Sequence, residues 1–338
     1  MEGRRNMDEF VKSAEKVVME PYNYTCSTNG KGIRSSLMAA FNYWLKVPES
    51  ILDVISSVIQ MLHNASLIID DIEDGSYLRR GKPAAHCVFG DASSINSANY
   101  VYFLALEKLS VLKRPESVTI FTEQMLELHR GQGMDIYWRS SFNCPSESEY
   151  EAMVLCKTGG LFGLGVRLMQ LFSKNQTDYK PLLDTFGLFF QIRDDYANLV
   201  DLSYHKKKMF AEDLTEGKFS YPIVRAINDF PDDSQVMNIL SQHTTNSSLK
   251  LHCVQHMLEL GAFEKTVLKL AKLEERCNQL IVEFGNNPLL SEVVHKLCDL
   301  HRTSDGNLRF ITLHDLNHPS EYNEIPITNG HVNLPSKC

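Results

Sequence analysis

The acidic stretch DDIED at residues 70–74 carries the clearest chemical signal, because it directly follows an apolar run. In a helix, residues i and i+4 lie on one face, about 6 Å apart along the axis, so Asp70 and Asp74 would present their carboxylates side by side. Like charges at this spacing destabilise a helix. The pattern makes sense if a divalent cation such as Mg²⁺ lies between them and is shared with a diphosphate.

A second cluster repeats this pattern downstream. The run GLFFQIR at residues 187–193 leads into Asp194 and Asp195, and Asn198 follows on the same helical face as Asp194. One such cluster would more often be a solvated helix face, but two that each follow a core-length apolar run favour a joint site. We therefore expect two facing helices that hold about two or three Mg²⁺ ions, bridged by a diphosphate.

The composition limits the class of protein. A chain of 338 residues that is 43% hydrophobic can bury a large core. The net charge of -8 argues against nucleic acid as the main partner. The eight cysteines are scattered and typical of reduced thiols in an intracellular protein. No secretory signal and no apolar run of membrane-spanning length is evident, so we expect a cytoplasmic protein without a transmembrane segment.

The apolar periodicity is helical almost throughout, and strand-like alternation is scarce. It predicts helices at 8–20, 35–45, 51–72, 96–112, 118–138, 147–172 and 181–202, with more between 221 and about 310. Ser35 and Ser36 are suitable N-cap residues for the second helix, and 86–94 is predicted to be a loop. The sequence thus predicts one all-α domain over residues 1–313, followed by a disordered tail at 314–338.

Several further motifs accompany the two clusters. They are MLHNAS at 61–66, LRRG at 78–81, INSANYVYF at 95–103, GQGMDIYW at 131–138, KTGGLFGL at 157–164 and EDLTEGKFSYP at 212–222. With these motifs the chain resembles the trans-isoprenyl diphosphate synthases, closest to the animal-type geranylgeranyl diphosphate synthases, over residues 21–310. The resemblance implies the isoprenoid synthase fold, a bundle of helices around a central cavity, and a homodimer or an assembly of dimers.

The resemblance also implies the reaction. An allylic diphosphate ionises, the double bond of isopentenyl diphosphate attacks the resulting carbocation, and a proton is lost. Small isoprenyl diphosphates are thus the expected partners, and Mg²⁺ is the expected cofactor, because the charge on the leaving pyrophosphate must be neutralised. The implied main metal ligands are Asp70, Asp74 and Asp194, and those with supporting roles are Asp71, Asp195 and Asn198.

The allylic diphosphate needs cations as well as metal. By resemblance these are Arg79, Lys157, Lys208 and Lys218. Lys157 lies in an otherwise apolar helical stretch, where burial would be costly without an anion. Gly159 and Gly160 interrupt the same stretch, which close packing or close approach to a ligand would explain. Thr158 and Gln191 match the residues whose oxygen dipoles face the carbocation. The catalytic set implied is Asp70, Lys157, Thr158, Gln191 and Asp194.

Isopentenyl diphosphate is expected on a separate basic patch without metal. The residues that match this patch are Lys31, Arg34, His63 and Arg80. A lone histidine on an apolar helix is more often an ordinary core residue. His63, however, lies seven residues before Asp70 and therefore on the same face of the helix.

The length of the product would depend on the depth of the cavity below the first cluster. Ala65 and Ser66, one turn before Asp70, are small and would leave a channel, whereas aromatic side chains there would stop elongation early. By resemblance, the floor of the channel consists of Tyr102, Phe103 and His129, although each of these residues could equally be ordinary core. This predicts geranylgeranyl diphosphate as the product, with farnesyl diphosphate as the main primer and shorter primers also accepted.

The basic loop at residues 30–36 departs from the family pattern. Gly32 stands where close relatives commonly carry Gln, and Ser35 and Ser36 stand where they carry a Thr-Lys pair. Two alternatives therefore stay open. One is a terpene synthase on the same scaffold, which ionises an allylic diphosphate and releases a hydrocarbon or alcohol. The other is a non-catalytic subunit that regulates another synthase, against which the intact acidic clusters argue.

Overall fold

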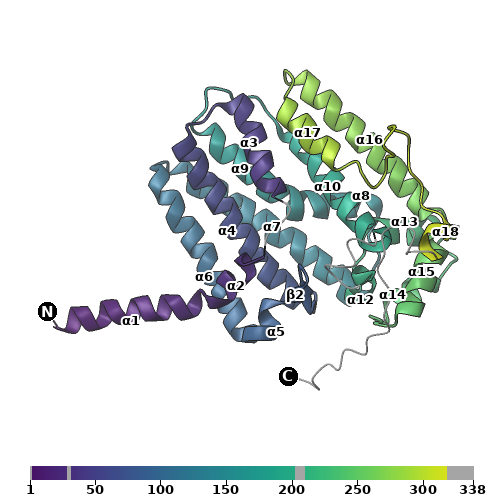
Figure 1. The fold of residues 1–338 in the computed structure, drawn as a ribbon, viewed down its shortest axis with the longest axis horizontal. Helices are drawn as coiled ribbons and strands as arrows, with labels where there is room; N and C mark the ends of the chain where they lie inside the picture. The colour runs from purple at the N-terminus through teal and green to yellow at the C-terminus, as the bar shows by residue number, and fades with distance from the viewer. Residues whose placement is uncertain (1, 29–31, 202–209, 318–338) are drawn as a thin grey trace.

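The computed structural model describes residues 2–28, 32–201 and 210–317, and nearly all of its regular structure is helical (Figure 1). The all-α fold predicted from the sequence is therefore confirmed. The elements of the first half are α1 Glu2–Val18, α2 Glu20–Cys26, α3 Ile33–Leu45, α4 Glu49–Glu73, β1 Leu78–Arg79, β2 Lys82–Pro83, α5 Ala85–Phe89, α6 Asp91–Leu109, the 3₁₀ turn η1 Ser110–Leu112 and α7 Glu116–Ser141.

The second half is also helical, and one of its segments is a π-helix. Its elements are α8 Glu147–Val154, the π-helix η2 Leu155–Gly159, α9 Gly160–Gln170, α10 Lys180–Val200, α12 Glu212–Glu216, α13 Tyr221–Asp229, α14 Gln235–Leu240, α15 Ser247–Glu259, α16 Ala262–Glu283, α17 Pro288–Lys296 and α18 Leu313–Asn317. In Figure 1, α4, α7 and α10 lie in the middle of the molecule, while α1 extends away from it at one side.

Two predicted boundaries were wrong. The second predicted helix begins at Ile33 as α3, so Ser35 and Ser36 lie inside its first turn and do not cap it. Gly32 precedes this helix with a φ of +67°, a left-handed conformation that glycine adopts without steric strain. Residues 86–94, predicted to be a loop, instead form most of α5 and the start of α6, with Gly90 between them.

Helix α4 forms because its apolar residues recur at helical spacing. Ile55, Val58, Ile59 and Leu62 are all buried and form one stripe along the helix. This stripe belongs to the main hydrophobic core, and α4 packs against α3, α6 and α9. The C-terminal end of α4, which carries Asp70, is thereby held in a fixed place against the rest of the bundle.

Helix α10 is the second core helix that ends in carboxylates. Phe189, Ile192, Tyr196 and Leu199 are buried at the same helical spacing, and the helix packs against α16 and η2. Its interior position fixes Asp194 in the same way that α4 fixes the first cluster. The prediction that both acidic clusters lie on core helices is confirmed.

The π-helix η2 lies between α8 and α9 and makes unusually close contacts. A Cβ added to Gly131 of α7 would lie 2.8 Å from the backbone nitrogen of Lys157, and one added to Gly187 of α10 would lie 3.2 Å from the Cα of Gly159. Single π turns within α-helices occur frequently at functional sites. The close approach of α7 and α10 to this segment accounts for the glycines at residues 131 and 187 of those helices, whereas a Cβ at Gly159 itself would meet nothing within 4 Å.

Strands β1 and β2 form a short antiparallel hairpin directly after the first acidic cluster. Leu78 pairs with Pro83, and Arg79 pairs with Lys82. The turn residues Arg80 and Gly81 have φ values of +55° and +79°, and positive φ at both central residues is the pattern of a type I′ turn. The hairpin therefore determines the directions in which the two neighbouring arginines leave the backbone.

The predicted tail begins with ordered residues. Helix α18 covers Leu313–Asn317 and contacts α15, and Leu316 is buried. The boundary at residue 313 was therefore placed too early, because a buried leucine holds this short helix against the fold. The rest of the predicted tail, 318–338, lies outside the described residues.

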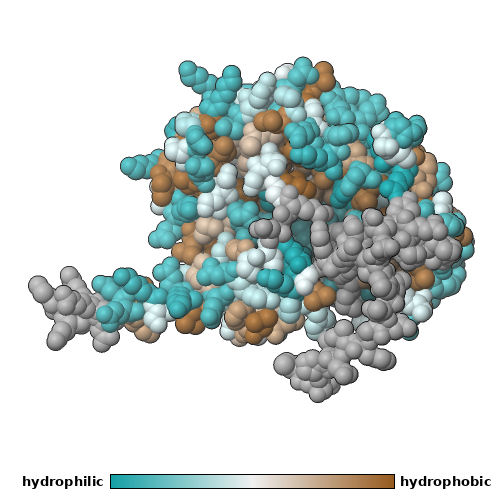
Figure 2. Space-filling model, viewed as in Figure 1, coloured by the Kyte–Doolittle hydropathy of each residue, from teal (hydrophilic) through white to brown (hydrophobic). Residues whose placement is uncertain are grey.

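Two helical runs, Glu49–Glu73 and Glu147–Gln170, are long and apolar enough to cross a membrane by length and composition alone. Core helices of globular proteins meet the same criterion, and 44% and 56% of the most apolar windows of these runs are buried inside the fold. Both runs are core elements, so they give only weak evidence for a span. On the face shown in Figure 2, hydrophobic side chains are scattered among hydrophilic ones.

The close contact between α7 and η2 predicts that a methyl group added at residue 131 destabilises the fold. Gly131→Ala would place a Cβ 2.8–2.9 Å from backbone and side-chain atoms of η2, and such overpacking typically costs about 1–3 kcal/mol. We expect a lower free energy of unfolding in urea. Gly133→Ala is the matched control, because a Cβ there meets nothing within 4 Å. Equal stability of the two variants would contradict the close contact.

Candidate active site

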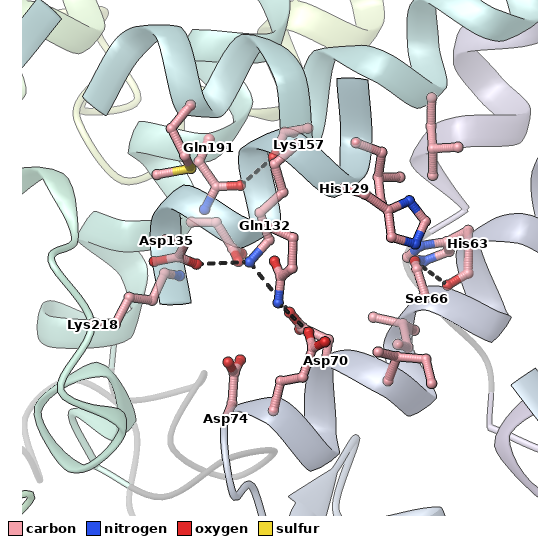
Figure 3. Close-up of a pocket in the computed structure, with 18 of the residues that line it drawn as sticks. His63, Ser66, Asp70, Asp74, His129, Gln132, Asp135, Lys157, Gln191 and Lys218 are labelled. Atoms are coloured by element: carbon pink, nitrogen blue, oxygen red, sulfur yellow. Dashed lines mark hydrogen bonds and ion pairs between the residues drawn. The ribbon is translucent and has the colours of Figure 1, made fainter. Parts of the chain in front are cut away.

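A cavity of about 460 Å³ opens between the C-terminal end of α4 and the helices α7, η2 and α10. Both predicted acidic clusters contribute to its lining. Figure 3 shows Asp70 and Asp74 on one wall and Lys157, Gln191 and Lys218 across the cavity from them. Segments more than one hundred residues apart in the sequence thus meet in one site.

The first cluster separates into two kinds of carboxylate. Asp70 and Asp74 line the cavity, whereas Asp71 is buried and accepts a hydrogen bond of 2.7 Å from Nε of Arg79. Arg79 also lies 3.5 Å from Asp70. The carboxylate of Asp71 thus holds Arg79 against the wall, and its supporting role in metal binding stays a prediction.

Lys157 bridges two walls of the cavity. Its Nζ lies 3.3 Å from Asp70 of α4 and donates a hydrogen bond of 2.9 Å to Asp135 of α7. Burial alone would lower the pKa of Lys157, but Asp135, Asp70 and Asp74 outweigh this effect and raise it. The ammonium group therefore stays charged in the buried wall.

Two residues of this wall were missed by sequence reasoning. Asp135 contacts Lys157, and Arg139 donates a hydrogen bond of 2.7 Å to Asp74. Both are buried. Asp135 belongs to a motif that supported the family resemblance, and a buried Asp-Arg pair at i and i+4 on a core helix is a signal that could have identified them.

In the second cluster, Asp194 and Asp195 both line the cavity. Asp195 is buried and accepts hydrogen bonds from the hydroxyl of Tyr150 (2.5 Å), from Nε2 of Gln191 (2.8 Å) and from the backbone nitrogen of Tyr221 (2.8 Å). Through these hydrogen bonds Asp195 links α8 and α13 to α10.

Asn198 does not reach the cavity lining among the described residues. It is buried, and its Oδ1 accepts a hydrogen bond of 3.1 Å from the backbone nitrogen of Asp213 at the start of α12. This contact helps to place α12 and the following Lys218, whose Nζ lines the cavity 3.5 Å from Asp195. Asn198 therefore helps to position α12, and its supporting role in metal binding stays a prediction.

Thr158 and Gln191 lie together on the cavity wall, as the resemblance implied. The hydroxyl of Thr158 donates a hydrogen bond of 2.6 Å to Oε1 of Gln191, whose Nε2 donates to Asp195. This chain of hydrogen bonds fixes the orientation of the Gln191 amide. The oxygen dipoles are thus held in place before any substrate arrives.

Three of the four residues predicted to bind isopentenyl diphosphate lie close to one another. Arg34 contacts Nε2 of His63 at 2.9 Å, and both line the cavity. Burial and the neighbouring Arg80 lower the pKa of Arg34 to about 10, despite the opposing effect of Asp194. Burial, Arg34 and Arg80 hold the pKa of His63 well below 6.5. Arg34 thus stays charged beside Arg80 while His63 is neutral, and partly buried guanidinium groups so close together indicate a pocket for an anion.

Arg80 takes a different direction from Arg79. Its guanidinium donates a hydrogen bond of 2.8 Å to the backbone oxygen of Thr28, before the loop that leads to α3. Two predicted site residues, Lys31 and Lys208, lie outside the described residues.

The predicted chain-length residues fall into three groups. Ser66, Tyr102 and His129 line the cavity, with the rings of Tyr102 and His129 in an edge-to-face contact at 6.2 Å. Ala65 is not among the described lining residues and is buried in a small cluster with residues of α2, α5 and α6. Phe103 is 72% exposed in the single chain and is not among the described lining residues, so its place in the floor stays a prediction. It lies next to Tyr102 on α6, and only one of the two can face inward.

The donor set of the cavity fits Mg²⁺. Seven carboxylates line it, against four lysines and arginines among the described residues. Burial, Asp70 and Glu216 raise the pKa of Asp74 to about 7, although Lys157 and Arg139 oppose the shift. Carboxylate oxygens are the protein ligands that Mg²⁺ prefers, and a divalent ion would offset this excess of negative charge. Asp70, Asp74 and Asp194 are the residues that could hold it.

The fold and this site belong to a known family. Residues 15–257 match the polyprenyl synthetase family, and the chain is a member of it. The chain is 49% identical to a terpene synthase of Matsumurasca onukii over 86% of its own length and 96% of that protein. It is 51% identical to a geranylgeranyl pyrophosphate synthase of Aspergillus fumigatus over 80% and 76%, and 49% identical to one of Dictyostelium discoideum over 83% and 92%.

The cation pocket predicts a pH dependence of stability. The pKa of His63 is well below 6.5 in the folded chain and near 6.5 when unfolded, so the unfolded state binds more protons between these values. The free energy of unfolding therefore falls as the pH drops below about 6.5. We expect His63→Gln to reduce this loss, as measured by urea unfolding at pH about 7 and about 5.5. An unchanged pH dependence in the variant would contradict a neutral His63.

Proposed function

We propose that this chain is a geranylgeranyl diphosphate synthase that joins an allylic diphosphate to isopentenyl diphosphate. The observation that carries the proposal is the continuity of one cavity. Its lining combines the acidic clusters, Arg34 with His63, and the pair Tyr102 and His129. Two diphosphate sites beside one cavity suit a coupling reaction, and the geranylgeranyl pyrophosphate synthases among the relatives support the same product.

In the proposed reaction, the carbon–oxygen bond of the allylic diphosphate breaks and its electron pair leaves with pyrophosphate. Arg79, Lys157 and Lys218 bind and orient this leaving group. Asp135 holds the ammonium of Lys157 in place through the 2.9 Å hydrogen bond. Mg²⁺, when bound by Asp70, Asp74 and Asp194, supplies positive charge that stabilises the pyrophosphate. Asp71 and Asp195 position the neighbouring cations.

The carbocation would be faced by Thr158 and Gln191, whose oxygen dipoles are already oriented by hydrogen bonds. Isopentenyl diphosphate would bind Arg34, His63 and Arg80, so that its double bond attacks the carbocation and a proton then leaves. Preorganised dipoles of this kind stabilise developing charge without reorganisation. The roles of Lys31 in the second diphosphate site and of Lys208 in the first stay predictions.

Product analysis tests this function directly. The purified chain, with Mg²⁺, is incubated with geranyl or farnesyl diphosphate, each with and without isopentenyl diphosphate. We expect geranylgeranyl diphosphate only when isopentenyl diphosphate is present, with farnesyl diphosphate as the preferred primer. A hydrocarbon or alcohol formed without isopentenyl diphosphate would refute the proposal, and the absence of any product would favour a non-catalytic subunit.

A terpene synthase is the second candidate, because a relative of that name matches the chain at 49% identity over 96% of its own length. Such an enzyme must ionise an allylic diphosphate but does not need isopentenyl diphosphate. The pocket of Arg34, His63 and Arg80 favours the synthase, because buried cations without a diphosphate to bind would be costly. The same assay separates the two activities.

The position of Ser66 in the cavity lining predicts that the size of the side chain at residue 66 limits the length of the product. It lines the cavity one turn before Asp70, so Ser66→Phe would fill space that the growing chain needs. With geranyl diphosphate as primer, we expect the main product to change from geranylgeranyl to farnesyl diphosphate. Ser57→Phe is the matched control on the same helix, because Ser57 is not among the described lining residues. An unchanged product from Ser66→Phe would refute this placement of the chain.

Two further expectations accompany this function. We propose that the catalytic unit is one domain that assembles as a homodimer or as several dimers, and that it acts in the cytoplasm. The exposed ring of Phe103 on α6 is the kind of apolar side chain that a second subunit would cover.

A further inference from the structure

A second group of metal-binding side chains lies away from the cavity, where α16 meets the chain that follows α17. Glu274, Cys298 and His301 offer donor atoms that all lie within 4.8 Å of one another. Cys298 and His301 are 5% and 0% exposed. None of the three is among the described residues that line the cavity. The group is therefore separate from the site of the proposed reaction.

The contacts in this group leave one buried atom unsatisfied. Oε2 of Glu274 lies 2.9 Å from Nε2 of His301 and accepts a hydrogen bond of 2.6 Å from Nε of Arg302. The thiol of Cys298 donates to the backbone oxygen of Val294 at 3.2 Å. Nδ1 of His301 is buried and has no hydrogen-bond partner within the part of the chain that the structure describes. Such an atom is rare in a folded interior unless it has a ligand.

We propose that Glu274, Cys298 and His301 form a structural Zn²⁺ site. One sulfur, one imidazole nitrogen and one carboxylate oxygen suit zinc, whereas Mg²⁺ prefers oxygen ligands alone. Cys277 is the neighbouring thiol that would complete four-coordination, although it does not belong to the group of three donors within 4.8 Å of one another. It is buried, it lies three residues after Glu274 on α16 and hence on the same face, and its thiol interacts electrostatically with both Cys298 and Glu274.

The charges in this group also balance. A zinc ion with two thiolates, one carboxylate and a neutral imidazole carries one negative charge. The guanidinium of Arg302, which already hydrogen-bonds Glu274, neutralises it. Metal ligands in proteins commonly receive such a hydrogen bond from a neighbouring group, which fixes the orientation of the ligand.

The proposed zinc would fasten the chain after α17 to α16, beside contacts that the same chain makes with α10. Arg193 of α10 donates hydrogen bonds to the backbone oxygen of Leu297 (2.9 Å) and to Asp299 (2.6 Å). The ring of Phe189, also on α10, meets His301 edge-on at 5.7 Å. Because α10 carries Asp194, the zinc would stabilise the outer side of a helix whose inner side lines the cavity. Its role is structural and does not depend on the proposed function.

Metal binding by the full-length chain tests this proposal. The protein is stripped of metal, reduced, and titrated with Zn²⁺ or Co²⁺ in the presence of excess Mg²⁺, which occupies all-oxygen sites. We expect about one zinc ion per chain and a higher temperature of unfolding. Bound Co²⁺ should show a thiolate-to-cobalt charge-transfer band, which carboxylate ligands do not produce. If the wild-type chain shows neither zinc binding nor this band, the proposal is wrong.

Variants locate the site. Cys298→Ser should weaken zinc binding at least about tenfold and lower the charge-transfer intensity, whereas His301→Gln should weaken binding with the band retained at saturation. Cys253→Ser is the matched control, because Cys253 is also a buried thiol but lies on α15. Circular dichroism verifies that each variant is folded. Wild-type affinity in folded Cys298→Ser, or in folded His301→Gln, would refute the assignment.

Discussion

The electrostatic bridge through Lys157 is the interaction on which the cavity depends. Its ammonium group links Asp70, at the end of α4, to Asp135 on α7, at 3.3 and 2.9 Å. Desolvation opposes a charged lysine at this depth, so only the surrounding carboxylates keep it protonated. The bridge also holds together walls that would otherwise repel, because carboxylates outnumber cations along the lining. The remaining negative charge favours the binding of divalent ions.

Packing constraints place this lysine. Lys157 lies in a π-helical segment against which α7 packs so closely that only glycine fits at residue 131. Gly187 permits a close approach from α10, although a less tight one. The glycines, which would weaken an isolated helix, thus bring three elements together around one charged side chain. Glycine at residues 131 and 187 lowers local helix stability but allows the close packing that places Lys157.

Adjacent residues serve different parts of the site because a tight turn separates them. Arg79 holds Asp71 at the end of α4, and Arg80 reaches the backbone of Thr28 beside the second cationic pocket. In that pocket Arg34 stays charged beside Arg80, and His63 is neutral because burial and the two arginines lower its pKa. One wall thus carries an excess of carboxylates and another an excess of cations, which suits two diphosphates bound in different ways.

The sequence by itself determined the all-α fold, the family and the helices that carry Asp70 and Asp194, because apolar periodicity and local charge patterns are properties of neighbouring residues. Tertiary structure alone decided which members of each cluster face the cavity. Asp71 and Asn198 share their motifs with the lining carboxylates, yet each is occupied by a contact with another segment. Tyr102 lines the cavity whereas Phe103 is exposed, and this difference likewise depends on how α6 packs. Such choices follow from contacts between distant segments, which spacing along the chain does not encode.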